Sequence, residues 1–168
     1  MGSRPAAIRT GRRRISGRNR FGSDPTIENV SAAIAAFERT LVLEDSCFDR
    51  FLGGDKGAIT PSAREGYSLF KEYGCVSCHQ GANVGGNLLQ YFGLMTHERS
   101  TFDLFRVPPL RMVAKTAPYF HDGSVATLDE AITIMGASQI GTGIPPDERV
   151  AIADFLRSLS EDCKARSK

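Results

Sequence analysis

The sequence predicts an all-α domain with long loops, and two observations lead to this prediction. Four separate segments repeat apolar residues at spacings of three and four, which is the period of a helix with one buried face. These helices and the loops between them leave little sequence for a sheet. The chain has 168 residues, 41% of them hydrophobic, and no apolar stretch near the ~20 residues that cross a bilayer. A membrane-spanning protein and a wholly disordered chain are therefore excluded.

The domain is expected to span residues 25–160, between a tail at 1–24 and a short C-terminal tail at 161–168. The first 24 residues hold seven Arg and one acid, whereas the rest of the chain holds 14 Lys and Arg against 18 Asp and Glu. Because the Arg-rich tail has no periodic apolar face, we expect it to be disordered and do not expect it to bind nucleic acid. It also lacks the apolar run of a secretory signal, so we expect the natural protein to be longer or to start differently.

The first two helices are expected near residues 24–41 and 60–74. Asp24 can cap the first helix with Pro25 in its first turn. The second helix is expected to open at Thr60-Pro61 and to stop at Gly74. The apolar face of the first helix repeats through Ile27, Val30, Ile34, Phe37 and Leu41.

The last two helices follow a long irregular region. Thr127 and Glu130 match a capping box ahead of a helix that ends at Gly136. Pro145-Pro146 opens the final helix, whose apolar positions also fit the helical period. Residues 81–126 are long for a loop in a compact domain unless the loop wraps a ligand or has a function.

A Cys-x-x-Cys-His run at Cys75, Cys78 and His79 points to that ligand, because it is the attachment signature of c-type haem. On one turn of chain, two thiols can add to the two vinyl groups while the imidazole reaches the iron. The alternatives are a zinc site, a thioredoxin-like pair and chance. Zinc would need a second ligand pair at short spacing, and Cys47 and Cys163 are isolated. A thioredoxin-like pair would follow a strand, whereas this motif follows a predicted helix.

The long loop carries the apolar residues that a macrocycle needs around it: Leu88, Leu89, Tyr91, Phe92, Leu94, Phe102, Phe105 and Leu110. A second axial ligand is usual for a cytochrome, and the thioether of Met raises the reduction potential. The residues alone leave Met95, Met112 and Met135 open. The small residues after Met135 favour it, because they would let backbone approach the ring.

Several runs are too specific to have arisen by chance: residues 34–41, 48–51, 75–86, 105–111 and 127–131, and above all Thr116-Ala117-Pro118-Tyr119-Phe120-His121-Asp122-Gly123-Ser124. Together they resemble the C-terminal half of the bacterial dihaem cytochrome c peroxidases, over roughly residues 25–160. The resemblance implies a cytochrome c-like helical domain wrapped around one covalently attached haem c.

The resemblance also implies the site residues. Cys75 and Cys78 would be the thioether anchors, His79 the proximal ligand of the haem iron and Met135 the distal one. The family binds a calcium ion partly through backbone carbonyls that correspond to Thr116 and Pro118, with a further ligand from the other domain. No catalytic residue is expected in this chain. A related branch that matures tryptophan-derived quinones has Tyr at the distal position, and Met135 argues against it.

Departures from the family limit the expected function. The chain has one Cys-x-x-Cys-His rather than two and lacks the domain that meets peroxide, and Met112 replaces an Asn of the family. We therefore expect a haem c electron-transfer domain that accepts electrons from a small donor protein, a cytochrome c or a cupredoxin. It would pass them to a low-potential haem domain or chain that reduces hydrogen peroxide to water. Whether this chain is itself an enzyme stays open. The alternative is a free-standing monohaem cytochrome c.

The remaining expectations concern location and single residues. Covalent haem c is attached in the bacterial periplasm, so the resemblance implies a periplasmic protein. Arg111 is a candidate partner of a haem propionate, with a surface ion pair as the alternative. His121 is expected to be structural. A disulfide between Cys47 and Cys163 is one possibility that the sequence leaves open.

Overall fold

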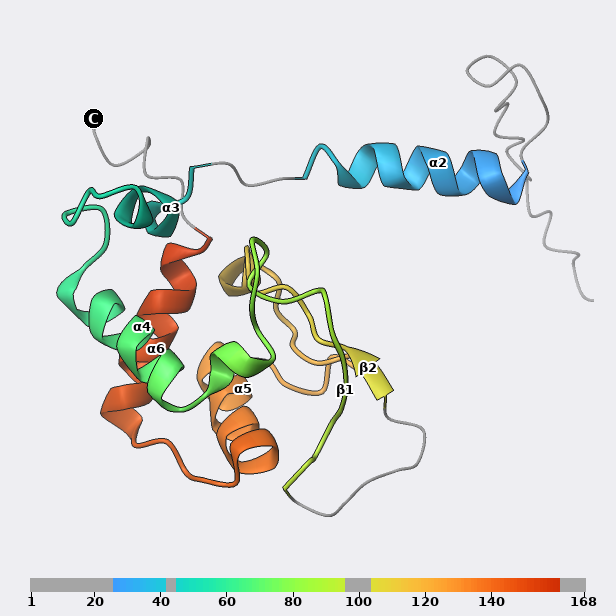
Figure 1. Ribbon diagram of the computed structural model, residues 1–168. Coiled ribbons are helices and arrows are strands. Elements are labelled where there is room, and N and C mark those ends of the chain that lie inside the picture. Colours follow the sequence, from blue (N-terminus) through green and yellow to red (C-terminus); the bar gives the residue numbers. More distant parts are fainter. Residues whose placement is uncertain (1–25, 42–44, 96–103, 161–168) are drawn as a thin grey trace, which may run out of the picture. The chain divides into compact units, whose positions relative to one another are not determined.

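The computed structural model describes residues 26–41, 45–95 and 104–160. It divides into two compact units, Met1–Val42 and Leu43–Lys168, which are described separately. Within the described residues five α-helices dominate and the strands amount to three residues each, so the all-α prediction is confirmed (Figure 1). No described helix is long and apolar enough to cross a membrane. The predicted tails, at 1–24 and 161–168, lie outside the described residues.

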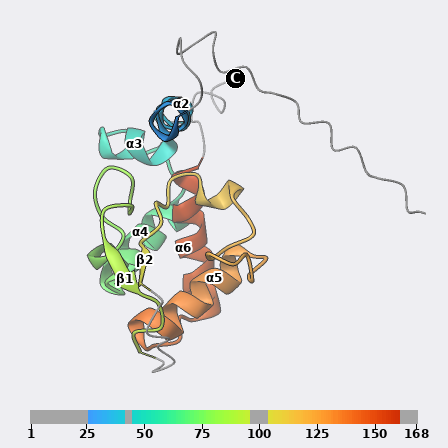
Figure 2. The same cartoon turned by 90° about the vertical axis from the view of Figure 1, so that its right-hand side faces the viewer.

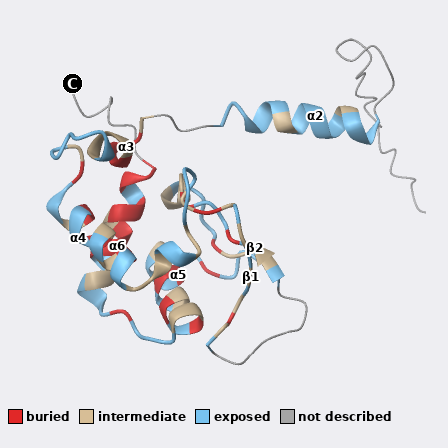
Figure 3. Ribbon diagram, in the orientation of Figure 1, coloured by how far each residue is buried: buried red, intermediate tan, exposed pale blue. Residues whose placement is uncertain are grey.

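Helix α2, Ile27–Glu38, is the described part of the first unit. Its N-cap is Thr26, whose hydroxyl oxygen accepts a hydrogen bond from the backbone N–H of Asn29 at 3.2 Å. The prediction of Asp24 as the cap was wrong, because Thr26 offers the same cap chemistry two residues later. No residue of α2 is buried, and the helix is coloured almost entirely as exposed in Figure 3.

The second unit begins with α3, Cys47–Leu52, which the sequence analysis did not predict. Ser46 and Asp49 form a capping box: the Ser46 oxygen accepts from the Asp49 N–H, and the Asp49 carboxylate accepts from the Ser46 N–H. That pair was the available signal for this helix. Cys47 and Phe48 are buried and fasten α3 to the core.

Helices α4 (Pro61–Glu72) and α6 (Pro146–Ser158) form the centre of the second unit and lie side by side (Figures 1 and 2). Both begin as predicted, α4 at Thr60-Pro61 and α6 after Pro145. α6 is the most buried helix and carries Phe155, Leu156 and Leu159 into the core (Figure 3).

Aromatic rings fill the space between these helices. The ring of Phe155 lies 5.0 Å from Phe48, 5.2 Å from Tyr67 and 5.1 Å from Phe70, measured between centroids. Such pairs contribute roughly 0.5–1.5 kcal/mol each beyond the area that they bury. Phe70 in turn lies 6.2 Å from the imidazole of His79, so this cluster connects the core to the Cys-x-x-Cys-His motif.

The segment between α4 and α5 is irregular, as predicted, except for short elements. Gln90 and Phe105 face each other in a small antiparallel ribbon. Tyr119 and Val125 form an isolated bridge further along. Strands of three residues are too short to be predicted from an alternation of polar and apolar residues. The elements are η1 (Cys75–Ser77), β1 (Leu89–Tyr91), β2 (Leu104–Arg106) and η2 (Val113–Lys115).

Helix α5, Leu128–Met135, begins where the sequence predicts, since the Thr127 hydroxyl oxygen accepts from the Glu130 N–H at 3.2 Å. Gly136 is its C-cap, also as predicted, but the chain then continues in a π-helical turn, η3, Gly136–Ile140. The turn ends at Gly141, whose positive φ of 78° suits glycine. Single π turns of this kind occur often at functional sites.

Candidate haem site

The Cys-x-x-Cys-His motif is a tight turn at the end of α4. Gly74 has a φ of 75°, a left-handed conformation that ends the helix and lets η1 start at Cys75. The His79 N–H donates to the Cys75 carbonyl at 2.9 Å, which closes the motif. Cys75 and Cys78 are both free thiols, as attachment to a macrocycle requires.

One large cavity, of about 570 Å³, has Cys75, Cys78, His79 and Met135 in its wall. This volume is in the range of sites for sizeable organic ligands, roughly 300–1,000 Å³. Met95 and Met112, the other two candidates for the distal ligand, do not line it. Of the three methionines that the sequence left open, Met135 is therefore the one that shares a cavity with His79.

Most of the cavity wall is apolar, which suits a porphyrin face. Five of the residues expected to wrap the macrocycle line it: Tyr91, Phe92, Leu94, Phe105 and Leu110. Leu88 and Leu89 do not, and Phe102 lies outside the described residues. The helices supply lining residues that the sequence analysis did not single out, namely Phe70, Leu128, Ala131, Ile132, Ile152 and Leu156. Two thiols, an imidazole and a thioether in an apolar cavity fit a haem c.

His79 is held as a neutral imidazole. Burial lowers its pKa below the ordinary value, and backbone groups of Pro108 and Val84 oppose this only in part. Its Nδ1 is buried and has no hydrogen-bond partner of good geometry in the described part of the chain. A neutral ring keeps a lone pair for a metal, so burial prepares His79 to act as a ligand.

Burial acts on the first thiol as well. Desolvation raises the pKa of Cys75 to about 11, with smaller contributions from its own backbone and from Cys78. Cys75 is therefore a protonated thiol at neutral pH in the unmodified chain. Because a thiolate is the reactive form, this thiol is protected from adventitious oxidation and metal capture.

The loop after the motif packs backbone to backbone against the segment that follows β2. The Gly86 N–H donates to the Val107 carbonyl at 2.8 Å, and the Leu110 N–H donates to the Val84 carbonyl at 3.1 Å. Gly85 has a φ of 129°, and a Cβ there would lie 2.3 Å from the Pro108 oxygen. Glycine is therefore required at residue 85, both for its φ and because a Cβ would collide with Pro108. This contact fixes the position of the backbone around His79.

Met135 is positioned by the end of α5. The next residue, Gly136, is buried, and a Cβ on it would lie 2.9 Å from the Ile144 side chain and 3.0 Å from the Thr142 carbonyl. Gly136 also lines the cavity, and its lack of a Cβ makes room for the loop that leads into α6. That the small residues here let backbone approach the ring stays a prediction.

Arg111 does not line the cavity, and of the two roles that the sequence left open the structure shows the ion pair. Its guanidinium forms a bidentate ion pair with Asp49, at 2.6 and 2.9 Å, and donates to the Ala82 carbonyl at 2.6 Å. These bonds lower the pKa of the Asp49 carboxyl, the Arg111 hydrogen bond most of all. Arg111 therefore joins α3 to the loop after the motif.

His121 and the predicted calcium ligands are nearer to the cavity. His121 lines it and stacks on Phe105, with ring centroids 4.4 Å apart. Thr116 and Pro118 also line it. Among the described residues no group of three or more His, Cys, Asp or Glu could hold a metal ion. Cys47 is disulfide-bonded, whereas Cys163 lies outside the described residues, so their pairing stays a prediction.

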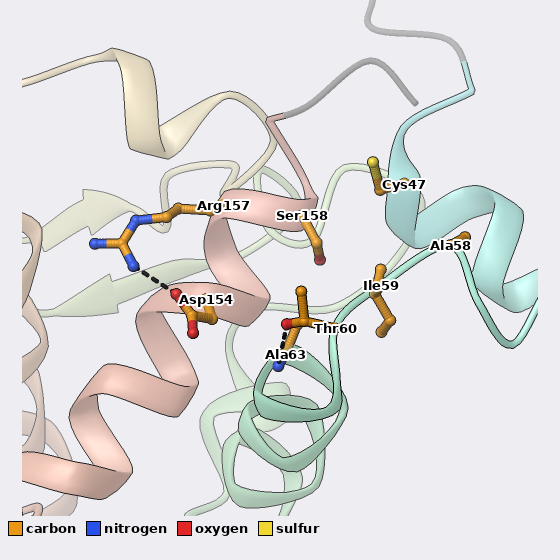
Figure 4. Close-up of a pocket in the computed structure, with 8 residues that line it drawn as sticks. All are labelled: Cys47, Ala58, Ile59, Thr60, Ala63, Asp154, Arg157 and Ser158. Carbon is orange, nitrogen blue, oxygen red and sulfur yellow. Dashed lines mark hydrogen bonds and ion pairs between the residues drawn. The ribbon is translucent and has the colours of Figure 1, made fainter. Parts of the chain in front are cut away.

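A second, smaller cavity of about 180 Å³ lies beside Cys47, between the start of α4 and the end of α6 (Figure 4). Asp154 in its wall already accepts hydrogen bonds from Ser62 and Arg157, at 2.7 and 2.6 Å. It contains none of the four predicted haem-binding residues and is too small for a macrocycle.

Comparisons with known proteins show the family of the chain. A family model described as cytochrome c matches residues 63–160, and one described as di-haem cytochrome c peroxidase matches residues 12–57. The chain is 42% identical over 158 residues to a cytochrome c551 peroxidase of Nitrosomonas europaea, covering 84% of this chain and 47% of the relative. A cytochrome c551 peroxidase of Pseudomonas aeruginosa is 40% identical over 157 residues, covering 83% and 45%.

A solved structure is also similar. It is the crystal structure of a MauG-like protein associated with microbial copper homeostasis, with a TM-score of 0.64 and 25% identity, covering 84% of this chain and 63% of that one. The chain thus spans about half the length of these two curated relatives. The chain therefore belongs to the di-haem cytochrome c peroxidase family, and the part of it that matches the cytochrome c model is a single cytochrome c domain.

Proposed function

We propose that this chain is an electron-transfer domain with one covalent haem c, held by Cys75 and Cys78 and ligated by His79 and Met135. The observation that carries the proposal is the placement of these four residues in the wall of one apolar cavity. A haem c supplies one-electron chemistry at iron. The chain supplies the anchors, the neutral imidazole, the thioether and the exclusion of water.

The residues favour relay of electrons over binding of peroxide. With His79 and Met135 as its two protein ligands, the haem iron would have no coordination position left for peroxide. The thioether and the apolar walls would favour ferrous iron and so raise the reduction potential. The aromatic cluster joins α4 to α6, and Ile132 of α5 packs into the same core, so His79 and Met135 would need to move little when the charge on the iron changed.

The direction of transfer is proposed from the relatives. Six of the similar curated proteins are named as cytochrome c peroxidases. We propose that the chain accepts electrons from a small donor protein, a cytochrome c or a cupredoxin. The acceptor is a low-potential haem domain or chain that reduces hydrogen peroxide to water. Covalent haem c attachment supports a periplasmic location.

A calcium ion at the backbone carbonyls of Thr116 and Pro118 is part of the same proposal. It is supported by the resemblance of the run 116–124 to the family and by the position of both residues at the cavity. An ion there needs further ligands from another domain. Calcium titration of the isolated chain should therefore show at most weak binding.

The test of the proposed function is the spectrum of protein matured in a periplasm. We expect a pyridine haemochrome of haem c with one haem per chain, and a low-spin spectrum with a Met-to-iron charge-transfer band. Met135→Ala should abolish that band, whereas the matched variants Met95→Ala and Met112→Ala should retain it. Retention of the band in Met135→Ala, or a colourless protein, would contradict the proposal.

A free-standing monohaem cytochrome c is the second candidate, favoured by the match of residues 63–160 to the general cytochrome c model. The two functions differ in the acceptor. Oxidation of the reduced chain in stopped flow that needs both a low-potential haem domain and hydrogen peroxide as the terminal oxidant supports the relay. Exchange with small donors alone supports the free carrier.

A further inference from the structure

Arg106 is the only Lys or Arg, among the described residues, that lines the large cavity. It is the last residue of β2 and faces Leu89 of β1 in the small antiparallel ribbon (Figure 1). The other basic side chains of the wall are His79, the proposed iron ligand, and His121, whose ring is stacked on Phe105. The described wall contains no Asp or Glu, so this largely apolar cavity carries one permanent positive charge.

The position of Arg106 is fixed, yet no described residue neutralises its charge. The Val107 N–H donates to the Leu88 carbonyl at 2.9 Å, and the Val107 carbonyl accepts from the Gly86 N–H at 2.8 Å. The Arg106 Nη1 donates to the Gly86 carbonyl at 3.0 Å. None of the ion pairs between described residues includes Arg106. A guanidinium has five N–H donors, so Arg106 can bind an anion while it keeps its bond to Gly86.

A haem c carries one kind of group that needs such a cation. Its macrocycle is apolar except for two propionates, which lie on the pyrrole rings without thioether bonds and are ionised near neutral pH. A carboxylate placed against apolar walls without a partner is costly. A guanidinium binds a carboxylate through two parallel N–H bonds, which give direction as well as energy. Arg111, the candidate from the sequence, already makes such a pair with Asp49.

We propose that Arg106 binds a propionate of the haem and thereby raises the reduction potential of the site. The inference rests on the proposed function. Cys75 and Cys78 would hold one side of the macrocycle covalently, and Arg106 would hold a propionate on another side. A propionate that is paired with a cation places less negative charge on the iron. The pair therefore stabilises the ferrous form relative to the ferric form, in the same direction as the thioether of Met135.

The test uses the full chain matured in a periplasm, so that each variant carries the covalent haem. Arg106→Gln removes the charge, whereas Arg106→Lys keeps the charge without the planar fork of the guanidinium. Arg157→Gln is the matched control, because the Arg157 side chain is 52% exposed and does not line the large cavity. Each form is assayed for haem content, the Met-to-iron band, the midpoint potential and the propionate bending band of the resonance Raman spectrum.

We expect all four forms to carry one haem per chain and to retain the Met-to-iron band. At the wild-type midpoint potential, the ratio of ferrous to ferric protein should fall roughly three- to tenfold in Arg106→Gln, because a unit charge near the macrocycle is lost. Arg106→Lys should keep most of the wild-type ratio, since it keeps the charge. The propionate band should shift in both Arg106 variants, whereas Arg157→Gln should match the wild type in both measurements.

The propionate band and the potential can each overturn the proposal. An unchanged band in both Arg106 variants would mean that no propionate contacts Arg106. A potential of Arg106→Gln equal to that of Arg157→Gln would mean that the charge does not act on the iron. If Arg106→Lys lowers the potential as much as Arg106→Gln, the role of Arg106 is to support the ribbon through Gly86.

Two further outcomes have a defined meaning. If Arg106→Gln does not fold, the propionate band of Arg106→Lys decides the matter alone, because that variant keeps the charge and the length of the side chain. A wild-type chain without haem, or without the Met-to-iron band, would contradict the proposed function itself. A failure of the proposed function is thereby distinguished from a failure of the role of Arg106.

Discussion

Gly85 lies directly against the carbonyl group of Pro108, so closely that a Cβ at residue 85 would be 2.3 Å from the oxygen and 3.0 Å from the carbon. The Pro108 backbone also acts on the pKa of His79. The contact therefore connects the loop after the haem-binding motif to the strand segment beyond it, at the imidazole proposed to ligate the iron.

Gly85→Ala should accordingly damage both the fold and the site. The added methyl group must displace the Pro108 carbonyl, and overpacking of this kind costs roughly 1–3 kcal/mol. The matched control is Gly86→Ala, which has a comparable positive φ of 88° but no atom within 4 Å of its Cβ. We expect urea unfolding to show a larger loss of unfolding free energy for Gly85→Ala than for Gly86→Ala. Redox titration should show a shifted midpoint potential only in Gly85→Ala. Equal effects of the two substitutions would mean that backbone strain alone is responsible.

The Asp49–Arg111 pair gives the second unit an acid-sensitive stability. Arg111 lowers the pKa of the Asp49 carboxyl in the folded state. A carboxyl with a lowered folded pKa stabilises the fold above its unfolded pKa, about 3.9, and that stability is lost as the pH falls through the folded value. Asp49→Asn should cost about 1–3 kcal/mol near neutral pH.

The same variant should lose less of its remaining stability than the wild type when the pH falls below 4. Urea unfolding at a series of pH values measures this difference. Asp154→Asn is the control, because its partner Arg157 is more than half exposed and their pair contributes little. A parallel shift of the wild-type and Asp49→Asn curves at every pH would show that the ion pair is not the source of the acid sensitivity.

Much of the fold could be predicted because its signals are local. Thr60-Pro61, Thr127 and Pro145 start their helices by chemistry that acts within one turn, so the sequence alone placed them. The proposed anchors and proximal ligand could be singled out for the same reason, since Cys75, Cys78 and His79 lie within five residues. Helix α3 was missed although Ser46 and Asp49 carried a capping signal, because its six residues are too few for periodicity.

The features that were not predicted depend on contacts between distant residues. Asp49 is 62 residues from Arg111, and nothing near Arg111 distinguishes an ion pair with Asp49 from one with a propionate. Chain length lets each of three methionines reach the iron, so only the family resemblance selected Met135 before the cavity was seen to contain it. Gly85 and Pro108 are likewise related only through the folded backbone. The cap of α2 is a local exception, because Asp24 and Thr26 can both cap a helix and the sequence does not choose between them.

The N-cap of α5 should affect the haem site, because Met135 is at the other end of that eight-residue helix. Thr127→Ala removes the acceptor for the Glu130 N–H and should cost about 1 kcal/mol. When thermal unfolding is followed at the Met-to-iron charge-transfer band, the variant should lose this band at a lower temperature than the wild type. Thr26→Ala removes the same kind of cap from α2. It should leave that transition unchanged, and an equal shift in both variants would contradict a local effect on α5.

Where α4 and α6 pack together, we expect a glycine-to-alanine substitution to destabilise the fold, although helix propensity alone would make it stabilising. Alanine is normally favoured over glycine inside a helix by about 1 kcal/mol, so Gly66→Ala in α4 would be expected to stabilise an isolated helix. Here a Cβ on Gly66 would lie 1.8 Å from the Ala151 carbonyl oxygen and 2.3 Å from its carbon. The helices must separate to admit it, which we expect to cost at least about 2 kcal/mol and to loosen the packing of Phe70 and Ile152 at the haem cavity.

Gly57→Ala, whose Cβ meets only the Asp55 carboxylate at 3.5 Å, is the control and should change the unfolding free energy little. Urea unfolding of the two variants, with haem retention measured on each, decides the matter: a neutral or stabilising Gly66→Ala would show that α4 and α6 do not approach as closely as their backbones indicate.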